Sequence, residues 1–132
     1  MSSVERPVTK PRPVYLNLVR IRLPLPGIVS ILHRLSGAGL FLVGLPLLLA
    51  WIQSSLASPE SFEAMRAMLA NPLAKITLIG LIWAYLHHFC AGLRYLLLDV
   101  LQFIELKPAR QSSAVVLIVS LVLTLIIGVW LW

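Results

Sequence analysis

Charged side chains and cysteines are scarce in this chain, and each shortage excludes a class of protein. Only 12% of the 132 residues are charged, whereas 59% are hydrophobic. A soluble domain of this length could not bury so much apolar surface, so the composition indicates an integral membrane protein. A single cysteine, Cys90, excludes an internal disulfide and the Cys-x-x-Cys-His pattern of covalent haem attachment. Iron–sulfur clusters need several cysteine ligands, so this chain alone cannot hold one.

The chain contains three long runs of apolar residues. Residues 35–52 and 114–132 contain no charged side chain, and residues 76–93 are interrupted only by two histidines. Each run is long enough for a helix to cross the hydrocarbon core of a bilayer, which is about 30 Å thick. We therefore expect an all-α integral membrane fold with three transmembrane helices and with the two termini on opposite sides.

Prolines indicate where these helices begin and end. Several prolines in residues 1–27 predict an extended cytoplasmic arm before a transmembrane anchor domain of residues 28–132. Pro46 is expected to kink the first helix, and Pro108 to lie in a turn before the third. The three spanning helices are expected at residues 28–54, 73–100 and 113–132.

The link between the first two spans has the pattern of a short helix. Ser58-Pro59-Glu60 combines an N-cap, a proline and an acid in the first turn, and apolar residues then recur at helical spacing up to Asn71-Pro72. A short amphipathic helix on the outer membrane surface fits this pattern.

The net charge of +6 is distributed unevenly around the three spans. Most cations lie before the first span or between the second and third, at Arg6, Lys10, Arg12, Arg20, Arg22, Lys107 and Arg110. Only Arg66 and Lys75 flank the link between the first two spans. This positive-inside pattern places the N-terminus in the cytoplasm and the C-terminus outside, and it argues against nucleic acid as a partner. Without a signal-peptide core or a long presequence, the expected location is the bacterial inner (cytoplasmic) membrane, with a periplasmic C-terminus.

His88 is the most unusual residue of the second run, because an imidazole within a membrane is costly and is a functional candidate by default. Gly92 lies one turn further along the same helix face, where the missing side chain would let a flat macrocycle approach the backbone. The pair suggests a haem ligand, although His88 could instead hydrogen-bond another helix. At about 100° per residue, His87 and Arg94 share a second face, and His87 is expected to pack there.

The first helix carries a matching polar cluster at Ser30, His33 and Arg34. Because this helix enters from the cytoplasm and the second leaves toward it, the cluster and His88 should lie at similar depth. A guanidinium such as that of Arg34 pairs well with haem propionates. Ser30 could donate a hydrogen bond to a quinone carbonyl, and Arg34 or His33 could stabilise the reduced oxygen. The alternatives are that Arg34 and Arg94 reach lipid phosphates and that Ser30 is an ordinary residue of a helix start.

These residues also form two ordered motifs. Residues 30–37, Ser-Ile-Leu-His-Arg-Leu-Ser-Gly, resemble the Ser-x-x-His-Arg-x-Ser/Thr-Gly element of the cytochrome b556 subunit family of succinate dehydrogenase. The run from His88 to Asp99 is similar to that family's His-x-x-x-Gly-x-Arg-His-x-x-x-Asp element. Tyr95 departs from it, since the family usually has histidine at this position. The likeness covers nearly the whole chain.

The resemblance implies one chain of the two-subunit membrane anchor of complex II. It implies that His88 is one axial ligand of the iron of haem b and that a histidine of the second anchor subunit is the other. It also implies a ubiquinone site at Ser30 and Arg34. The expected haem pocket, including the propionate partners, comprises His33, Arg34, Gly92 and Arg94.

The expected function is electron transfer from succinate to ubiquinone, as an anchor of succinate:ubiquinone oxidoreductase. The chain has neither a dinucleotide fold for flavin nor cysteines for iron–sulfur clusters, so a flavoprotein subunit and an iron–sulfur subunit must supply both. Membrane lipid and the second anchor subunit are further expected partners. Two alternatives stay open: an anchor of a quinol:fumarate reductase, and a non-catalytic assembly or scaffold protein whose histidine only packs.

Overall fold

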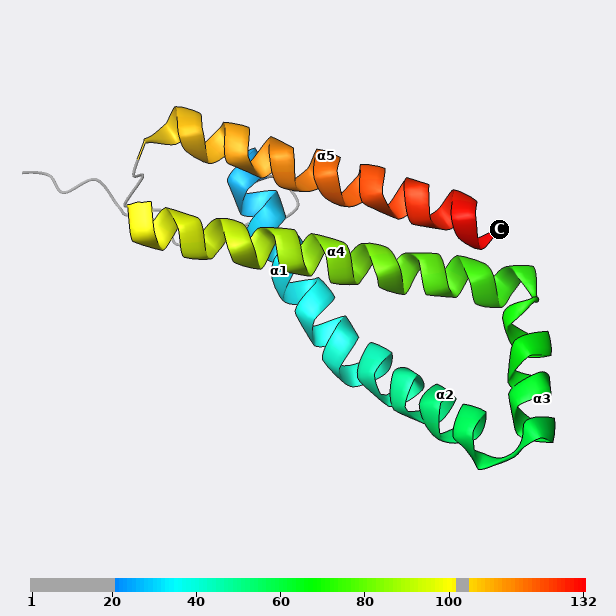
Figure 1. Ribbon diagram of the computed structural model, residues 1–132. Helices are drawn as coiled ribbons and strands as arrows, with labels where there is room; N and C mark the ends of the chain where they lie inside the picture. The colour runs from blue at the N-terminus through cyan, green and yellow to red at the C-terminus, as the bar shows by residue number, and fades with distance from the viewer. Residues whose placement is uncertain (1–20, 102–104) are drawn as a thin grey trace, which may run out of the picture.

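The computed structural model describes residues 21–101 and 105–132, and these residues form helices joined by short links, without a strand (Figure 1). The elements are α1 (Leu25–Gly39), a π-helical turn (Leu40–Gly44), α2 (Leu45–Ala57), α3 (Pro59–Leu69), α4 (Pro72–Leu101) and α5 (Leu106–Leu131). Three helices are long and apolar enough to span a membrane: Leu25–Ala57, Pro72–Leu101 and Leu106–Leu131. The expected all-α membrane fold is therefore confirmed. Most of the arm expected at residues 1–27 lies outside the described residues.

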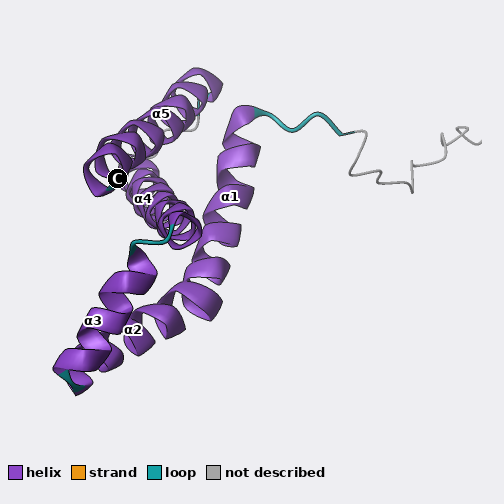
Figure 2. Ribbon diagram, turned by 90° about the vertical axis from the view of Figure 1, so that its right-hand side faces the viewer, coloured by secondary structure: helices purple, strands orange, loops and turns teal. Residues whose placement is uncertain are grey.

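The first span changes direction in its middle, just before Pro46. Proline has no N–H to donate back to the preceding turn, so the regular bonding pattern is interrupted there. The backbone N–H of Leu45 bonds the carbonyl of Leu40, five residues back, which is the bond of a π-helical turn. The helix axis bends between α1 and α2 (Figure 2). The kink expected at Pro46 is thus present as a π-helical turn.

Two helix starts differ from the sequence prediction for one reason. α1 begins at Leu25, before the expected residue 28, and α5 begins at Leu106, so that Pro108 lies inside the helix. Both Pro26 and Pro108 occupy first turns, where a backbone N–H has no partner within the helix anyway. The sequence predicts the first helix to begin after Pro26 and a turn at Pro108, and both predictions are wrong because each proline lies in the first turn of a helix.

The link helix α3 is capped as predicted. The Ser58 hydroxyl accepts from the N–H of Ser61 at 3.1 Å, and the Ser61 hydroxyl accepts from the N–H of Ser58 at 3.0 Å. A hydrogen bond from its own backbone, and a second from Ser58, lower the pKa of the Glu60 carboxyl. This short helix joins the far ends of α2 and α4 (Figure 1).

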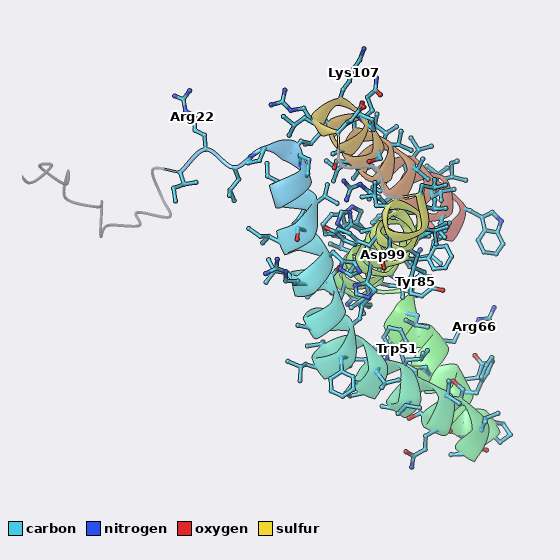
Figure 3. All side chains as sticks on the ribbon, turned by 90° about the vertical axis from the view of Figure 1, so that its left-hand side faces the viewer. Arg22, Trp51, Arg66, Tyr85, Asp99 and Lys107 are labelled. Carbon is cyan, nitrogen blue, oxygen red and sulfur yellow. The ribbon has the colours of Figure 1, made fainter. Side chains whose placement is uncertain are left out.

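Helix α4 lies at the centre of the packing, with α5 antiparallel on one side and α1 crossing steeply on the other (Figures 1 and 2). Among the described residues, the buried hydrophobic core consists only of Val29 of α1, Ala91 of α4 and Val116 of α5. Side chains project freely along the outer sides of α1 and α2 (Figure 3). So small a core leaves most apolar surface for lipid or for another membrane subunit to cover.

Polar contacts join α5 to α4 at both ends of their antiparallel pair. Arg94 is 7% exposed, and its guanidinium donates from Nε to the Ser112 hydroxyl at 2.9 Å and from Nη2 to the Ala109 carbonyl at 3.1 Å. At the other end, Lys75 Nζ donates to the carbonyl of Trp132 at 3.1 Å. The α4–α5 pair is therefore held by a buried guanidinium as well as by packing.

The buried hydroxyls in the middle of α5 bond within their own helix. Ser120 donates to the carbonyl of Leu117 at 3.1 Å, and Thr124 donates to the carbonyl of Ser120 at 2.7 Å. A hydroxyl in a membrane helix can always reach the preceding turn, and this local bond satisfies its donor without a partner helix.

Replacing Arg94 by methionine should weaken the α4–α5 contact while keeping a side chain of similar length. Two hydrogen bonds from a charged donor are lost, so we expect a destabilisation of roughly 1–3 kcal/mol. The readout is the midpoint of thermal unfolding of the detergent-purified assembly that contains the chain. Arg110→Met, at an exposed position, is the matched control. Equal midpoints for the two variants would contradict the role given to Arg94.

Candidate functional site

Two glycines mark the place where α1 and α4 cross, and each faces a histidine of the other helix. A Cβ added at Gly37 would lie 2.6 Å from Cε1 of His88, closer than real Cβ atoms approach. A Cβ added at Gly92 would lie 3.6 Å from Nε2 of His33, which is an ordinary contact. The crossing therefore requires glycine at position 37 and is looser at position 92.

The imidazoles of His33 and His88 stack face to face in this crossing. Their ring centroids are 4.1 Å apart and their planes differ by 8°. The ring of Tyr95 meets His33 edge-on, with centroids 5.3 Å apart and planes 61° apart. The contact confirms that the polar cluster of the first span and His88 lie at one depth. It also shows that the space beside Gly92 is occupied by His33 in this chain.

A backbone carbonyl fixes the tautomer of His88. Its Nδ1 lies 2.9 Å from the carbonyl oxygen of His33. Because a carbonyl can only accept, Nδ1 must carry the proton and donate it, which leaves the lone pair on Nε2. No described residue hydrogen-bonds that Nε2. A metal-binding histidine is held in this way, with one ring nitrogen donating to the protein and the other facing the metal.

Ser36, to which the sequence pattern assigned no role, contacts both atoms of this hydrogen bond. Its hydroxyl donates to the same His33 carbonyl at 3.0 Å and lies 3.4 Å from Nδ1 of His88. Ser36 is 7% exposed. The only sequence signal for it was its place as the Ser/Thr of the first motif.

Ser30 and Arg34 form a separate polar pair on α1. Arg34 donates from Nη2 to the Ser30 hydroxyl at 3.2 Å, one helical turn away. Ser30 is half-buried and Arg34 is exposed. The pair thus presents a hydroxyl and a guanidinium side by side at the bundle surface, one turn from His33.

Arg94 and His87 are on the second face of α4, as expected, and do not join the histidine cluster. The Arg94 guanidinium is bound to α5. His87 is fully buried, packs against Trp83, and has no hydrogen-bond partner for either ring nitrogen among the described residues. The possible ion pair between Arg94 and Asp99 is absent from the described part of the chain, where the one ion pair joins Arg66 to Glu63 at 3.7 Å.

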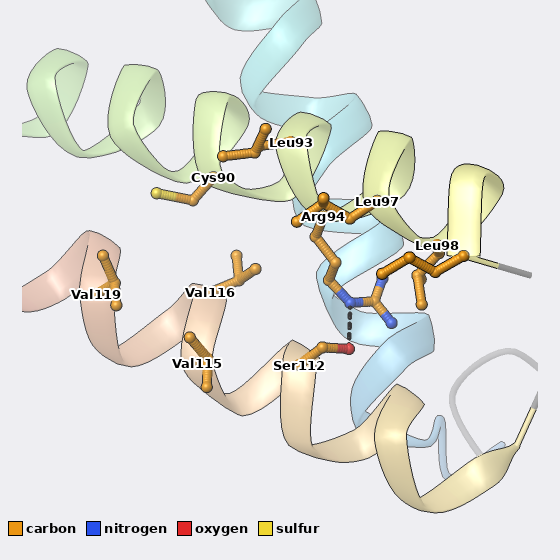
Figure 4. Close-up of a pocket in the computed structure, with 10 residues that line it drawn as sticks. Cys90, Leu93, Arg94, Leu97, Leu98, Ser112, Val115, Val116 and Val119 are labelled. Atoms are coloured by element: carbon orange, nitrogen blue, oxygen red, sulfur yellow. Dashed lines mark hydrogen bonds between the residues drawn. The ribbon is translucent and has the colours of Figure 1, made fainter. Parts of the chain in front are cut away.

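A groove of about 410 Å³ runs between α4 and α5 (Figure 4). Its lining is apolar except at Arg94 and Ser112, and it includes Cys90, Leu97 and Val119. Neither His33 nor His88 contributes to it. This groove is therefore not the site that the polar residues of α1 and α4 build.

The fold defines a class, the all-α integral membrane proteins with three spanning helices. Residues 8–127 match the family model of the succinate dehydrogenase/fumarate reductase transmembrane subunit. The succinate dehydrogenase cytochrome b556 subunit of Coxiella burnetii is 35% identical, over 92% of this chain and 97% of its own. That of Paracoccus denitrificans is 35% identical, over 88% and 91%. That of Rickettsia typhi is 25% identical, over 98% and 100%.

The chain belongs to the succinate dehydrogenase/fumarate reductase transmembrane subunit family. Its relatives are named as subunits of succinate dehydrogenase, an oxidoreductase. Their common name, cytochrome b556, denotes a protein with haem b. The suggested resemblance and the multi-pass membrane location are confirmed.

The two glycines of α1 provide a matched test of the crossing. Gly37→Ala places a methyl group against the His88 ring and should cost about 1–3 kcal/mol, the usual range for overpacking. Gly39→Ala meets no atom within 4 Å and should be neutral or slightly stabilising, because alanine is the better helix former. Thermal unfolding of the purified complex measures both. A Gly37→Ala variant as stable as Gly39→Ala would contradict the tight crossing.

Proposed function

We propose that this chain is a membrane anchor of succinate:ubiquinone oxidoreductase, in which His88 is one axial ligand of haem b and Ser30 and Arg34 form part of the ubiquinone site. The observation that carries the proposal is the bond from Nδ1 of His88 to the His33 carbonyl, because it orients the ring and leaves Nε2 for iron. The two atoms are 2.9 Å apart, and the donor, His88, lies within a candidate membrane span.

The residues of the crossing fit a haem held without covalent attachment. His88 provides a nitrogen ligand, and two helices supply the apolar surroundings that a porphyrin needs. His33 occupies the space beside Gly92, so its ring would have to move before a porphyrin could approach the backbone there. His33 and Arg34, at and beside the crossing, would hold the propionates. Arg94 would have to give up its bonds to α5 to reach the same group, so we assign it to the α4–α5 contact. When bound, the haem would supply a one-electron relay or reservoir.

A second ligand to the iron would come from the other anchor subunit. The ring centroids of His33 and His88 are only 4.1 Å apart, too close for the two imidazoles to hold one iron from opposite sides. His87 points to a different face of α4 and is buried in the core. Two imidazole ligands would leave the iron no open position, which favours electron transfer over oxygen binding.

The quinone chemistry rests on the Ser30–Arg34 pair. A hydroxyl can donate to a quinone carbonyl, and a guanidinium stabilises the negative charge that develops on that oxygen as electrons arrive. Two electrons, passed from succinate through the flavoprotein and iron–sulfur subunits, and two protons from the cytoplasmic side convert ubiquinone to ubiquinol. The proposed orientation has the N-terminus in the cytoplasm and the C-terminus in the periplasm of a bacterial inner membrane, as the cation distribution favours.

Two alternatives are weaker. An anchor of a quinol:fumarate reductase would have the same fold, and the family name covers both enzymes, but the relatives named above are succinate dehydrogenase subunits. A scaffold protein with a packing histidine would not account for the haem b that the relatives' name, cytochrome b556, denotes.

The ligand assignment predicts that His88→Ala abolishes the low-spin b-type spectrum of the assembled complex. His87→Ala should retain that spectrum, since its side chain lies on another face. The measurements are the reduced-minus-oxidised absorption spectrum and the low-spin electron paramagnetic resonance signal, normalised to the flavin content of the complex. A normal spectrum in the His88→Ala variant would show that the ligand assignment is wrong.

The quinone assignment predicts a selective loss of one activity. Arg34→Ala should lower succinate–ubiquinone reductase activity about 10- to 100-fold, and Ser30→Ala about 10-fold, as expected for a charged and a neutral hydrogen bond. Succinate oxidation by an artificial acceptor should persist, because it needs only the soluble subunits. Arg66→Ala, exposed on α3, is the control. Parallel loss of both activities would indicate failed assembly and contradict the assignment.

A further inference from the structure

The carbonyl of His33 is shared among more donors than a helical carbonyl normally meets. Within α1 it faces the backbone N–H four residues ahead, as in any α-helix. It also accepts from the Ser36 hydroxyl at 3.0 Å and from Nδ1 of His88 at 2.9 Å. A carbonyl oxygen has two lone pairs, so three donors compete for it and each weakens the others.

Other hydroxyls of this chain bond the preceding turn without such competition from an imidazole. Ser55 donates to Trp51 at 2.7 Å and Thr77 to Leu73 at 2.9 Å. Among the described residues, only the Ser36 hydroxyl shares its acceptor with a histidine ring. Ser36 is also buried, so water cannot readily replace its hydrogen bond. What sets Ser36 apart is that a histidine ring shares its acceptor.

Competition at this carbonyl has a consequence for the ligand on the far side of the ring. The more strongly Nδ1–H donates, the more basic Nε2 becomes, and a more basic ligand stabilises ferric iron relative to ferrous iron. A hydroxyl that occupies the same carbonyl weakens the donation from Nδ1 and favours the ferrous form. The 3.4 Å contact between the Ser36 oxygen and Nδ1 keeps the hydroxyl close to the donor as well.

We propose that Ser36 is a positioning residue that limits the hydrogen bond from His88 to the His33 carbonyl and so raises the reduction potential of haem b. This inference rests on the proposed role of His88 as a haem ligand. It assigns to Ser36 no contact with haem or quinone; the hydroxyl acts only through the carbonyl and the imidazole.

The test is a redox titration of haem b in the purified Ser36→Ala complex. With the hydroxyl gone, the Nδ1 bond strengthens, and the ratio of ferric to ferrous haem at a fixed ambient potential should rise about 2- to 10-fold, the range that one hydrogen bond produces. Haem content and low-spin ligation should be unchanged. Ser36→Thr retains the hydroxyl and should restore the wild-type ratio. Ser55→Ala removes a hydroxyl with the same kind of helical bond and should leave the ratio unchanged.

Each other outcome has a separate meaning. A Ser36→Ala complex with the same ratio as Ser55→Ala, or with a shift toward the ferrous form, overturns the inference about Ser36. Loss of haem from an assembled Ser36→Ala complex overturns it too, because Ser36 would then be needed for binding. Retention of a normal low-spin spectrum by His88→Ala overturns instead the ligand assignment on which the inference rests.

Discussion

The close approach of α1 and α4 at Gly37 is the constraint on which the rest of the site depends. A single methyl group there would collide with the His88 ring, which lies directly over the glycine backbone. Because the ring lies so close, its Nδ1 reaches the His33 carbonyl and its face meets the His33 imidazole. In a membrane, where hydrophobic burial does not drive helices together, such close packing at small residues supplies much of their association. The same close contact at Gly37 therefore packs α1 against α4 and orients the ring of His88.

Polar groups within the spans are satisfied in two different ways, and the difference separates structure from function. The buried hydroxyls of α5 bond within their own helix, and the guanidinium of Arg94 donates to Ser112 and Ala109 and so holds α5 against α4. The Nε2 atom of His88 and the exposed guanidinium of Arg34 have capacity left over, and both ring nitrogens of the buried His87 also lack a partner among the described residues. Unused hydrogen-bonding or ligand capacity is costly in a low-dielectric environment. Only at His88 does a second hydrogen bond fix the ring that carries the unused nitrogen, and this separates the candidate site from the buried His87.

The sequence alone predicted the three spans, the link helix and the common depth of the two polar clusters. Those features follow from run lengths, capping residues and helix direction, which are one-dimensional properties. The starts at Leu25 and Leu106 were missed because a proline ends a helix only when it lies beyond the first turn. The partners of Arg94 and the contact of Ser36 with His88 were also missed. Periodicity gives the face on which a residue lies, but the crossing of two helices decides which atoms meet there.

The parallel stack of His33 and His88 explains why the proposed haem site needs a second subunit. Two imidazoles would hold the iron from opposite sides, whereas the rings of His33 and His88, with centroids 4.1 Å apart, lie too close together to do so. The small core and the long exposed apolar faces of α1 and α2 also leave surface for another helix or for lipid to cover. On this proposal the chain orients one imidazole through its own backbone and leaves the opposite face of the haem to its partner. The shape of the haem, and not only the number of histidines in the chain, then makes the site a shared one.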